Sequence, residues 1–436
     1  ASFKMLGVRF SNSVMSVALD TNKQVLEAVQ NKDSAQKEYT EIPAPILDLE
    51  ALEELHLDNN RIEVIPKEIC HLRNIKVLYL NNNNITHVCE ELGELQNLQR
   101  LDLSFNPLEY DSLNIVSKVQ HLRELRLYSA NLEELPVAIC NSLQCLELLG
   151  LSNNHLMSLP EETVKLVQLK EIYLQNNKLE NFPMELCLLP NLEIIDLERN
   201  ALKAIPAEIG SLSKLLKLFL GFNSISNTAI KMLPSDLSNL SYIRVLDLSQ
   251  NLLTEIPPVI CTLKQLEILS LDDNHISLII PEIKELTQLN YLGLTGNRFT
   301  GFPEEICLLE SLERLYIGQD QGTRLAHLSE NICMLKNLKE LYIENNNLEC
   351  LPSNISCLQN LIILDCRNNL LKQLPEGICS LQALQKLLLQ NNRLSVLPDK
   401  LDLLPKLELL ALEGNPMTDP PAELCSLGRL AIWHFL

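Results

Sequence analysis

Hydrophobic residues recur along most of the chain with a period of 23, in the pattern L-x-x-L-x-L-x-x-N-x-L-x-x-L-P-x-x-I-x-x-L. Self-similarity at this spacing indicates that each copy forms one supersecondary unit. A single copy cannot bury its own leucines, so stability requires that neighbouring copies stack on one another. We count sixteen copies, which begin at Leu52, Ile75, Leu98, Leu122, Leu146, Leu169, Leu192, Leu215, Ile243, Leu266, Leu289, Leu312, Leu338, Leu361, Leu384 and Leu407.

Each copy predicts a strand, a turn and a helical segment. The alternating L-x-L part is typical of a short strand with one buried face. The L-P-x-x-I-x-x-L part, as in Leu159-Pro160, predicts a short helix or 3-10 segment that follows the proline. The fold class is therefore α/β: a leucine-rich-repeat solenoid of about sixteen repeats, with a curved parallel sheet on the concave side and helical segments on the convex side.

An asparagine follows the strand in fourteen of the sixteen copies, and Ala130 and Asp320 replace it in the other two. A buried amide both donates and accepts hydrogen bonds, so it can satisfy backbone groups that the turn leaves unpaired. The fourteen are Asn60, Asn83, Asn106, Asn154, Asn177, Asn200, Asn223, Asn251, Asn274, Asn297, Asn346, Asn369, Asn392 and Asn415.

The repeats occupy residues 52–417 and are flanked by two segments that we expect to cap the stack. Residues 1–51 form an irregular N-terminal cap with a degenerate repeat, and residues 418–436 form a C-terminal cap helix. Two copies carry insertions, within residues 224–233 and 318–327. Such insertions form loops on one face, either as tolerated bulges or near a binding surface.

The formal net charge of −20 and the pI near 4.9 favour a partner with a basic surface, and argue against nucleic acid and anionic membranes. No apolar run is long enough for a membrane span, and no signal peptide is visible. Thirteen cysteines, an odd number without clustered cysteine caps, favour a reducing compartment. We therefore expect a cytoplasmic protein.

The sequence offers no catalytic centre. It has no G-x-S-x-G, H-E-x-x-H or phosphate-binding loop, no C-x-x-C pair and no histidines at ligand spacing, so we expect no enzyme activity, cofactor or metal. Val8-Arg9-Phe10 has the form of a phosphatase-docking peptide, although a degenerate capping strand explains it equally. Eight cysteines share one repeat position and read as small buried apolar residues: Cys70, Cys140, Cys187, Cys261, Cys307, Cys333, Cys379 and Cys425.

The third, fifth and seventh residues of each L-x-x-L-x-L frame should point out of the sheet on its concave face. Exposed aromatic side chains on a rigid sheet are typical of protein interfaces, although aromatic residues also simply suit strands. Acidic residues are numerous on the same face and would attract a basic partner. The predicted partner-binding residues are Tyr79, Tyr128, Tyr173, Asp196, Glu198, Phe219, Asp247, Tyr291, Tyr316 and Tyr342.

Residues 52–417 resemble the intracellular leucine-rich-repeat group of the Shoc-2 kind. Stretches that depart from the bare consensus more closely resemble the leucine-rich repeat and IQ domain-containing proteins. This resemblance is specific, because the repeat pattern itself does not require Gln319 or Cys366. That resemblance implies a cytoplasmic interaction protein with a calmodulin-binding IQ helix. The sequence contains no I-Q-x-x-x-R-G-x-x-x-R motif, so calmodulin binding is not carried over, and residues 1–37 do not match. The stretches are Leu315-Tyr-Ile-Gly-Gln-Asp-Gln-Gly322, Lys339-Glu-Leu-Tyr-Ile-Glu-Asn-Asn346, Leu364-Asp-Cys-Arg367, Leu370-Leu-Lys-Gln-Leu-Pro375 and Ala431-Ile-Trp433.

These observations favour a non-catalytic scaffold that binds a partner protein on its concave face, in intracellular signalling. The alternative is a structural component of a cytoskeletal or ciliary assembly, in which the solenoid is a fixed spacer. A soluble signalling partner would favour the first function, and association with axonemes would favour the second.

Overall fold

The computed structural model describes residues 39–226 and 238–436. The docking peptide suggested at residues 8–10 and most of the N-terminal cap lie outside the described residues. So does the greater part of the insertion at residues 224–233. By its internal contacts the chain divides into two compact units, unit 1 (Ala1–Asn200) and unit 2 (Ala201–Leu436).

The strands are three residues long and overlap the predicted L-x-L part of every copy, but each begins and ends one residue earlier. In the described part of the chain, unit 1 contains β1 (Glu54–His56), β2 (Val77–Tyr79), β3 (Arg100–Asp102), β4 (Glu124–Arg126), β5 (Leu148–Gly150), β6 (Glu171–Tyr173) and β7 (Ile194–Asp196). The strands described in unit 2 are β8 (Lys217–Phe219), β9 (Val245–Asp247), β10 (Ile268–Ser270), β11 (Tyr291–Gly293), β12 (Arg314–Tyr316), β13 (Glu340–Tyr342), β14 (Ile363–Asp365), β15 (Lys386–Leu388) and β16 (Leu409–Ala411).

Short helical segments follow the proline position of the copies, and most are 3-10 helices. Unit 1 contains α2 (Ala44–Leu47), η2 (Lys67–His71), η3 (Glu90–Glu94), α3 (Tyr110–Val116), α4 (Val137–Ser142), η4 (Glu161–Lys165) and η5 (Met184–Leu188). Unit 2 contains η6 (Ala207–Ser211), η8 (Pro258–Thr262), η9 (Pro281–Glu285), η10 (Glu304–Leu308), η11 (Glu330–Met334), η12 (Ile355–Cys357), η13 (Glu376–Ser380), η14 (Leu401–Leu403), α6 (Ala422–Cys425) and α7 (Arg429–Phe435). None of these described helices has the length and hydrophobicity that a membrane crossing requires.

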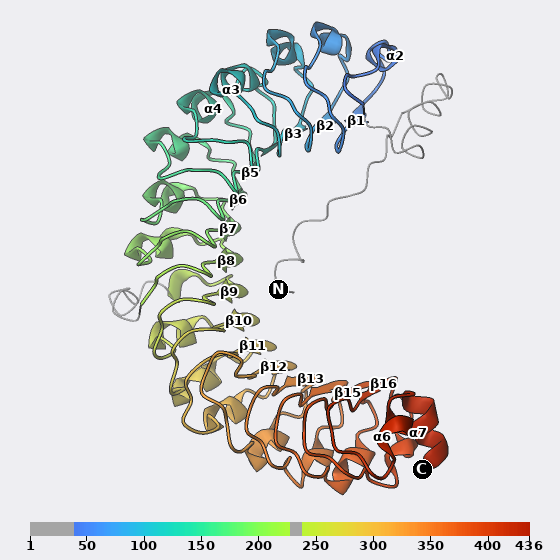
Figure 1. Cartoon of the computed structure of the whole chain (residues 1–436). Helices are drawn as coiled ribbons and strands as arrows, with labels where there is room; N and C mark the ends of the chain where they lie inside the picture. The colour runs from blue at the N-terminus through green and yellow to red at the C-terminus, as the bar shows by residue number, and fades with distance from the viewer. Residues whose placement is uncertain (1–38, 227–237) are drawn as a thin grey trace. The chain divides into compact units, whose positions relative to one another are not determined.

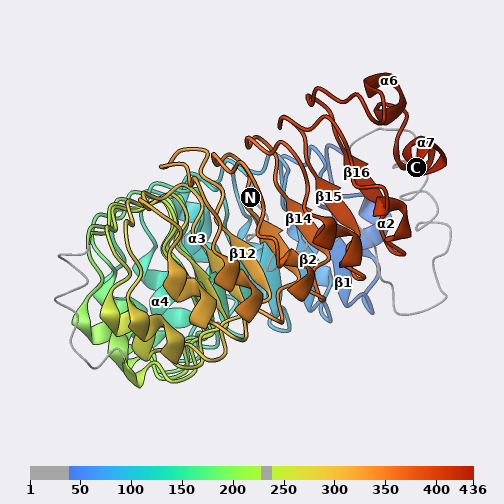
Figure 2. The ribbon, with the colours of Figure 1, turned by 90° about the horizontal axis from the view of Figure 1, so that it is seen from below.

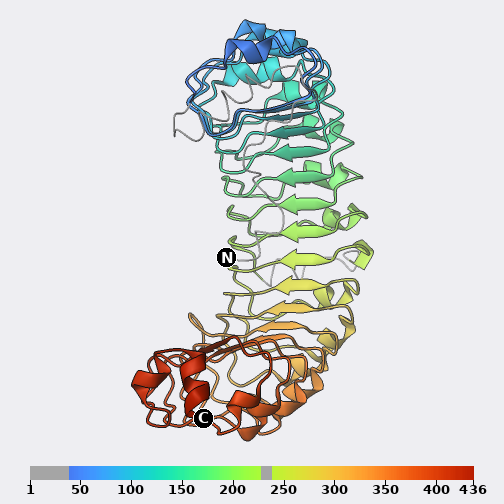
Figure 3. The ribbon, with the colours of Figure 1, turned by 90° about the vertical axis from the view of Figure 1, so that its right-hand side faces the viewer.

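Within each unit the strands pair in parallel, in chain order, with equivalent positions opposite one another. Leu55 lies opposite Leu78 in unit 1, and Leu315 lies opposite Leu341 in unit 2. Figure 3 shows the strands of each unit side by side, and Figure 1 shows them along the inner side of the unit with the helical segments along the outer side. The leucines between the two layers are buried. This arrangement confirms the predicted solenoid.

The asparagine that follows each strand joins two copies, as the sequence predicts. The Asn177 Oδ1 atom accepts the Leu156 N–H at 3.0 Å, and its Nδ2 donates to the carbonyls of Leu151 and Leu174, both at 3.0 Å. Two of these three partners belong to the preceding copy. All fourteen asparagines donate in the same way to the carbonyl three residues before them.

The residue directly before this asparagine adopts a left-handed backbone conformation, which the sequence analysis did not predict. Asn59, Asn176 and Asn368 have φ values of 59°, 57° and 57°. Gly296 and Gly414 occupy the same position with φ values of 69° and 79°, where glycine is favoured because it has no Cβ. The many asparagines at this position are explained by the same preference, since asparagine tolerates this region better than most residues.

In the two copies that lack the asparagine, other side chains form hydrogen bonds to the backbone of the turn. Gln319, one residue before Asp320, is fully buried; its Oε1 accepts the Asn297 N–H at 2.9 Å and its Nε2 donates to the Ile317 carbonyl at 3.0 Å. In the other copy the buried Ala130 has no amide, and Asn154 of the next copy accepts the Ala130 N–H at 3.0 Å instead.

The ends of the described chain continue the stack. In unit 1, the Tyr39 N–H donates to Asn60 Oδ1 at 2.9 Å, so residue 39 takes the place of a preceding copy. In unit 2, α6 and α7 follow the last strand (Figure 2). Ile432 of α7 is buried, whereas Leu427 and Leu430 remain largely exposed, so this terminal segment covers the core with only part of its apolar surface.

We expect Asn177→Ala to lower the free energy of unfolding by about 1–3 kcal/mol, because the buried Leu156 N–H loses its acceptor. The carbonyls of Leu151 and Leu174 each keep a second amide donor. Urea denaturation measures this change. Asn337→Ala is the matched control: this exposed side chain donates only to the Glu310 carbonyl, so its loss should change stability by about 0.5 kcal/mol or less. Equal losses for both variants would contradict the role assigned to the buried amide.

We also expect Gln319→Asn to destabilise the chain, although asparagine is the consensus residue one position later. The side chain would be one methylene too short to reach both Asn297 and Ile317, so a buried N–H would lose its partner at a cost of about 1–3 kcal/mol. The same denaturation experiment checks it. If the variant is as stable as the parent, the length of the Gln319 side chain is not what allows these hydrogen bonds.

Candidate protein-binding surface

Three tyrosines stack across neighbouring strands on the concave face of unit 2. Tyr291 lies on β11, Tyr316 on β12 and Tyr342 on β13. The ring centroids of Tyr291 and Tyr316 are 4.9 Å apart with planes inclined by 34°, and those of Tyr316 and Tyr342 are 4.3 Å apart and nearly parallel, at 7°. All three side chains are half-buried. We call this group the tyrosine ladder.

The parallel register produces the ladder. Tyr316 and Tyr342 occupy the same frame position and are paired directly across β12 and β13. Adjacent strands lie about 4.8 Å apart, which is close to the spacing at which aromatic rings stack. Because the rings stack along the sheet, their faces contact one another, so a partner would meet their edges and hydroxyl groups.

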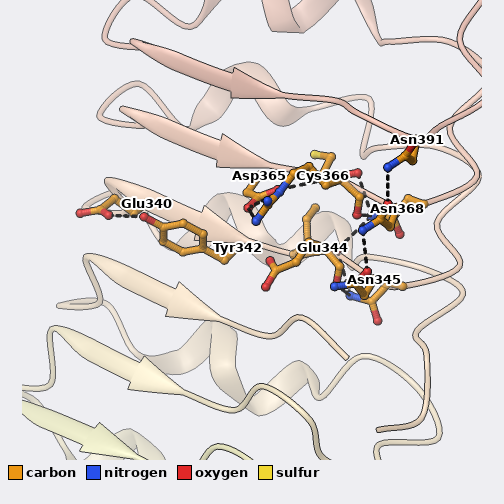
Figure 4. A network of polar contacts seen from close by, with 12 residues as sticks. Glu340, Tyr342, Glu344, Asn345, Asp365, Cys366, Asn368 and Asn391 are labelled. Carbon is orange, nitrogen blue, oxygen red and sulfur yellow. Dashed lines mark hydrogen bonds and ion pairs between the residues drawn. The ribbon is translucent and has the colours of Figure 1, made fainter. Parts of the chain in front are cut away.

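A carboxylate fixes one end of the ladder. The Tyr342 hydroxyl donates to Glu340 Oε1 at 2.6 Å (Figure 4). Glu340 Oε2 pairs with Arg314 Nε at 2.8 Å. Burial raises the pKa of Tyr342, and the hydrogen bond to Glu340 raises it further. The pKa of Tyr316 is also raised by burial. The ladder is therefore made of neutral hydroxyl groups at physiological pH, held in fixed positions.

Two carboxylates flank the ladder in a poorly solvated setting. Glu344 follows Tyr342 by two residues and lies near it (Figure 4). The Glu344 carboxylate covers Gly318, because a Cβ atom added at Gly318 would come within 2.4 Å of Glu344 Oε1. Its Oε2 atom is buried and has no hydrogen-bond partner among the described residues. Burial, followed by the nearby charges of Asp365 and Asp320, raises the pKa of Glu344 to about 7.

Asp272 covers Gly293 in the same manner as Glu344 covers Gly318. Its Oδ1 accepts the Thr295 N–H at 2.8 Å and its Oδ2 accepts the Ser270 hydroxyl at 3.1 Å. Burial raises the pKa of Asp272 to about 7 despite these hydrogen bonds. Asp272 is therefore a half-buried, hydrogen-bonded residue rather than a solvated one.

A second row of asparagines runs beside the ladder on the left-handed turn positions. Asn368 Nδ2 donates to Asn345 Oδ1 at 2.8 Å, and Asn391 Nδ2 donates to Asn368 Oδ1 at 2.9 Å (Figure 4). Sequence reasoning missed this row because it considered only the buried asparagine of each copy. Two adjacent asparagines in successive copies, as in residues 345–346 and 368–369, are the signal that could have revealed it.

In unit 1, two of the predicted aromatic residues are not exposed. Tyr128 and Tyr173 are 6 % and 9 % exposed, and they form a small apolar cluster with Leu148 and Ile194. The Tyr128 ring lies over Gly150, which leaves room for it because a Cβ there would come within 2.5 Å of the ring. The predicted exposure of these two tyrosines was wrong, because their own neighbours on the concave face cover them.

The three acidic residues predicted to attract a partner are buried as well. Asp196, Glu198 and Asp247 are 7 %, 4 % and 6 % exposed. Asp196 Oδ1 accepts the Glu198 N–H at 3.0 Å, and Asp247 Oδ1 accepts the Ser249 N–H at 2.9 Å. The carboxylates of Asp196 and Asp247 therefore hold the backbone at the ends of β7 and β9. Replacing them with lysine would destabilise the fold, so a loss of partner binding in such a variant could not be assigned to charge.

The remaining predicted residues lie half-buried on the concave face. Tyr79 packs beside His56, with ring centroids 4.6 Å apart and an interplanar angle of 50°, and Phe219 ends β8. The structure thus brings Tyr291, Tyr316 and Tyr342 together within unit 2 and pairs Tyr79 with His56 within unit 1. Within the described ranges, no group of three or more His, Cys, Asp or Glu residues could hold a metal ion.

Family models described as "Leucine rich repeat" match residues 50–108, 120–179, 167–225, 242–263 and 337–358. A solved leucine-rich-repeat protein of Leptospira interrogans is similar at 33 % identity, with a TM-score of 0.78, over 89 % of this chain and 96 % of that one.

Two mammalian relatives share stronger local similarity. The mouse and human proteins named "Leucine-rich repeat and IQ domain-containing protein 4" are 57 % and 54 % identical over 142 residues, which is 33 % of this chain. The match spans about a quarter of each relative, 24 % of the mouse protein and 25 % of the human one. This similarity bears out the resemblance noted in the repeats.

We expect stability to fall as the pH rises from about 5 to about 8, because Glu344 has a folded-state pKa of about 7 against an ordinary value of 4.5. Between these values the folded state retains a proton that the unfolded state has lost. Glu344→Gln should reduce this loss by roughly 1–3 kcal/mol. Denaturation curves at the two pH values measure it.

Glu413→Gln removes an exposed carboxylate from the same frame position and should keep the slope of the parent chain. If Glu344→Gln and Glu413→Gln show the same pH dependence as the parent, Glu344 is ordinarily solvated and the geometry described above is wrong.

Proposed function

Because the chain belongs to the leucine-rich-repeat proteins, we propose that it is a non-catalytic cytoplasmic scaffold in intracellular signalling, which binds a partner protein on the concave face of unit 2. Proteins of this family generally mediate contacts with other proteins. No enzyme family matches the chain among the comparisons given above, and the mechanism requires only that side chains on a rigid sheet be presented to a partner.

The tyrosine ladder is the observation that supports this proposal. Tyr291, Tyr316 and Tyr342 are half-buried, so their rings already have fixed orientations before any partner arrives. An interface residue that is already ordered loses little side-chain entropy on binding. Large aromatic residues with few rotamers are also enriched among the residues that dominate binding energies. We therefore propose that the tyrosine ladder, rather than Tyr128 and Tyr173, provides the main contacts with the partner.

The charge of the chain supports a basic partner. The net charge is −20, and on the concave face Arg314 and Arg367 are each paired with a carboxylate of this chain, Glu340 and Asp365. Their positive charges are therefore locally balanced. An exposed carboxylate at Asp320, which interacts electrostatically with Glu344, adds to the negative potential. A partner with a basic surface would associate faster at low salt than at high salt.

All thirteen cysteines are free, which supports the cytoplasmic assignment. Long proteins of oxidising compartments commonly pair their cysteines, whereas thiols persist where glutathione keeps them reduced. The similarity to the mouse and human relatives is compatible with such a scaffold, but their names do not state a partner.

The test places a photoreactive benzoyl-phenylalanine at Tyr316 in the full chain and irradiates it in a cell extract. We expect a discrete cross-linked protein whose yield falls as salt rises, because the ladder lies in the interface. The control variant carries the same group at Tyr242, which is 58 % exposed and lies outside the concave face positions. Cross-linked products are identified by mass spectrometry.

A product that forms equally from both positions, or from Tyr242 alone, would contradict the proposed surface. Identification of axonemal proteins as the product at Tyr316 would instead favour the alternative function, in which the solenoid is a structural part of a cilium.

A further inference from the structure

The cysteines on the convex side differ in exposure although eight of them share one repeat position. Cys140, Cys187, Cys261 and Cys307 are buried, which agrees with the interpretation of these residues as small apolar side chains. The other four, Cys70, Cys333, Cys379 and Cys425, are partly exposed, so that interpretation does not describe them fully. A partly exposed thiol is accessible to reagents in solution.

One copy places a ninth cysteine on the convex side, one position later than the others. Six copies read Ile-Cys, as in Ile332-Cys333, whereas this copy reads Ile355-Ser-Cys357. The side chain of Cys357 is exposed and lies at the end of η12. Because of the shift of one residue, it is not aligned with the shared cysteine position and can approach the preceding copy.

Cys333 and Cys357 lie beside each other on neighbouring copies. The Cys333 Sγ donates to the carbonyl of Asn354, at the start of η12, at 2.8 Å, and the Cys357 N–H donates to the same carbonyl at 3.0 Å. The Cys333 thiol on η11 is therefore held against the single turn of η12 that carries Cys357. Burial raises the pKa of Cys333, and the interaction with Cys357 raises it further.

We propose that Cys333 and Cys357 form an oxidation site, at which hydrogen peroxide produces a disulfide between neighbouring copies of the repeat. This inference is independent of the proposed partner-binding function, since the two cysteines lie on the opposite side of the solenoid from the tyrosine ladder. The exposed Cys357 reacts first, and the less accessible Cys333 resolves the intermediate.

The reaction balances with peroxide as the only oxidant. The Cys357 thiol loses its proton, its sulfur attacks one peroxide oxygen, and the O–O bond breaks. The hydroxide that leaves takes up this proton, so a sulfenic acid and one water form. The Cys333 sulfur then attacks the Cys357 sulfur, the S–O bond breaks, and the thiol proton leaves with the hydroxyl group as a second water. Two thiols and one peroxide give one disulfide and two waters.

The disulfide would link the copy that contains Tyr316 to the copy that contains Tyr342, because η11 follows β12 and η12 follows β13. It would close a loop of about two dozen residues and restrict the separation of these two copies in partly unfolded states. We therefore expect the oxidised chain to melt at a higher temperature than the reduced chain.

The experiment treats the full chain with limiting peroxide, blocks remaining thiols with N-ethylmaleimide, and identifies linked peptides by mass spectrometry without reduction. Trypsin separates Cys333 from Cys357 but leaves Cys350, Cys357 and Cys366 in one peptide, residues 340–367. Fragmentation of that peptide therefore assigns the linked residue. We expect a link between Cys333 and Cys357 to exceed every other cysteine link and to disappear on treatment with dithiothreitol.

Cys357→Ser should abolish the link and the rise in melting temperature, and, since the residue is exposed, it should fold as the parent does. Cys350→Ser removes another exposed cysteine of the same peptide and should leave the link intact. The proposal is overturned if peroxide links Cys333 to Cys307 instead, if Cys357 proceeds to sulfinic acid unlinked, or if Cys350 is oxidised while Cys333 and Cys357 stay free.

Discussion

The fold depends on the hydrogen bonds that each buried asparagine makes between consecutive copies. A strand of three residues cannot form a stable sheet alone, and the turn after it leaves carbonyl and N–H groups pointing into the core. Asn177 satisfies groups of its own copy and of the preceding one at the same time. The hydrogen bonds that end one strand therefore fix the position of the next, and the leucine core is assembled in register as a result.

This strict register determines what the concave face can present. Every strand brings its third, fifth and seventh residues to fixed places about 4.8 Å from those of its neighbours. Similar side chains at one frame position consequently contact one another, as Tyr316 and Tyr342 do. Acidic side chains at the same position instead turn back onto the backbone, as Asp196 and Asp247 do. Identity at a frame position therefore does not by itself make a residue available to a partner.

The strands, the helical segments, the buried asparagines and the parallel order could be predicted because they follow from a pattern repeated many times. The candidate surface could be predicted only in part. The position of each tyrosine in the repeat predicts the face of the sheet on which it lies. It does not predict that Tyr128 packs against Leu148 and over Gly150 and is therefore buried. Nor could it show that Gly318 leaves space for the Glu344 carboxylate. Both outcomes depend on contacts between copies, which no single copy of the pattern encodes.

Gln319 shows that the copies of the repeat share the location of a side-chain amide group rather than the identity of one residue. Its extra methylene compensates for its place one residue earlier, so its Nε2 still donates to the carbonyls of Leu294 and Ile317, and its Oε1 accepts the Asn297 N–H. A search that requires asparagine would interrupt the solenoid at Asp320 and divide one continuous stack into two shorter ones. Boundaries drawn from consensus letters alone can therefore fall inside an intact array, at a place where a different side chain still joins two copies.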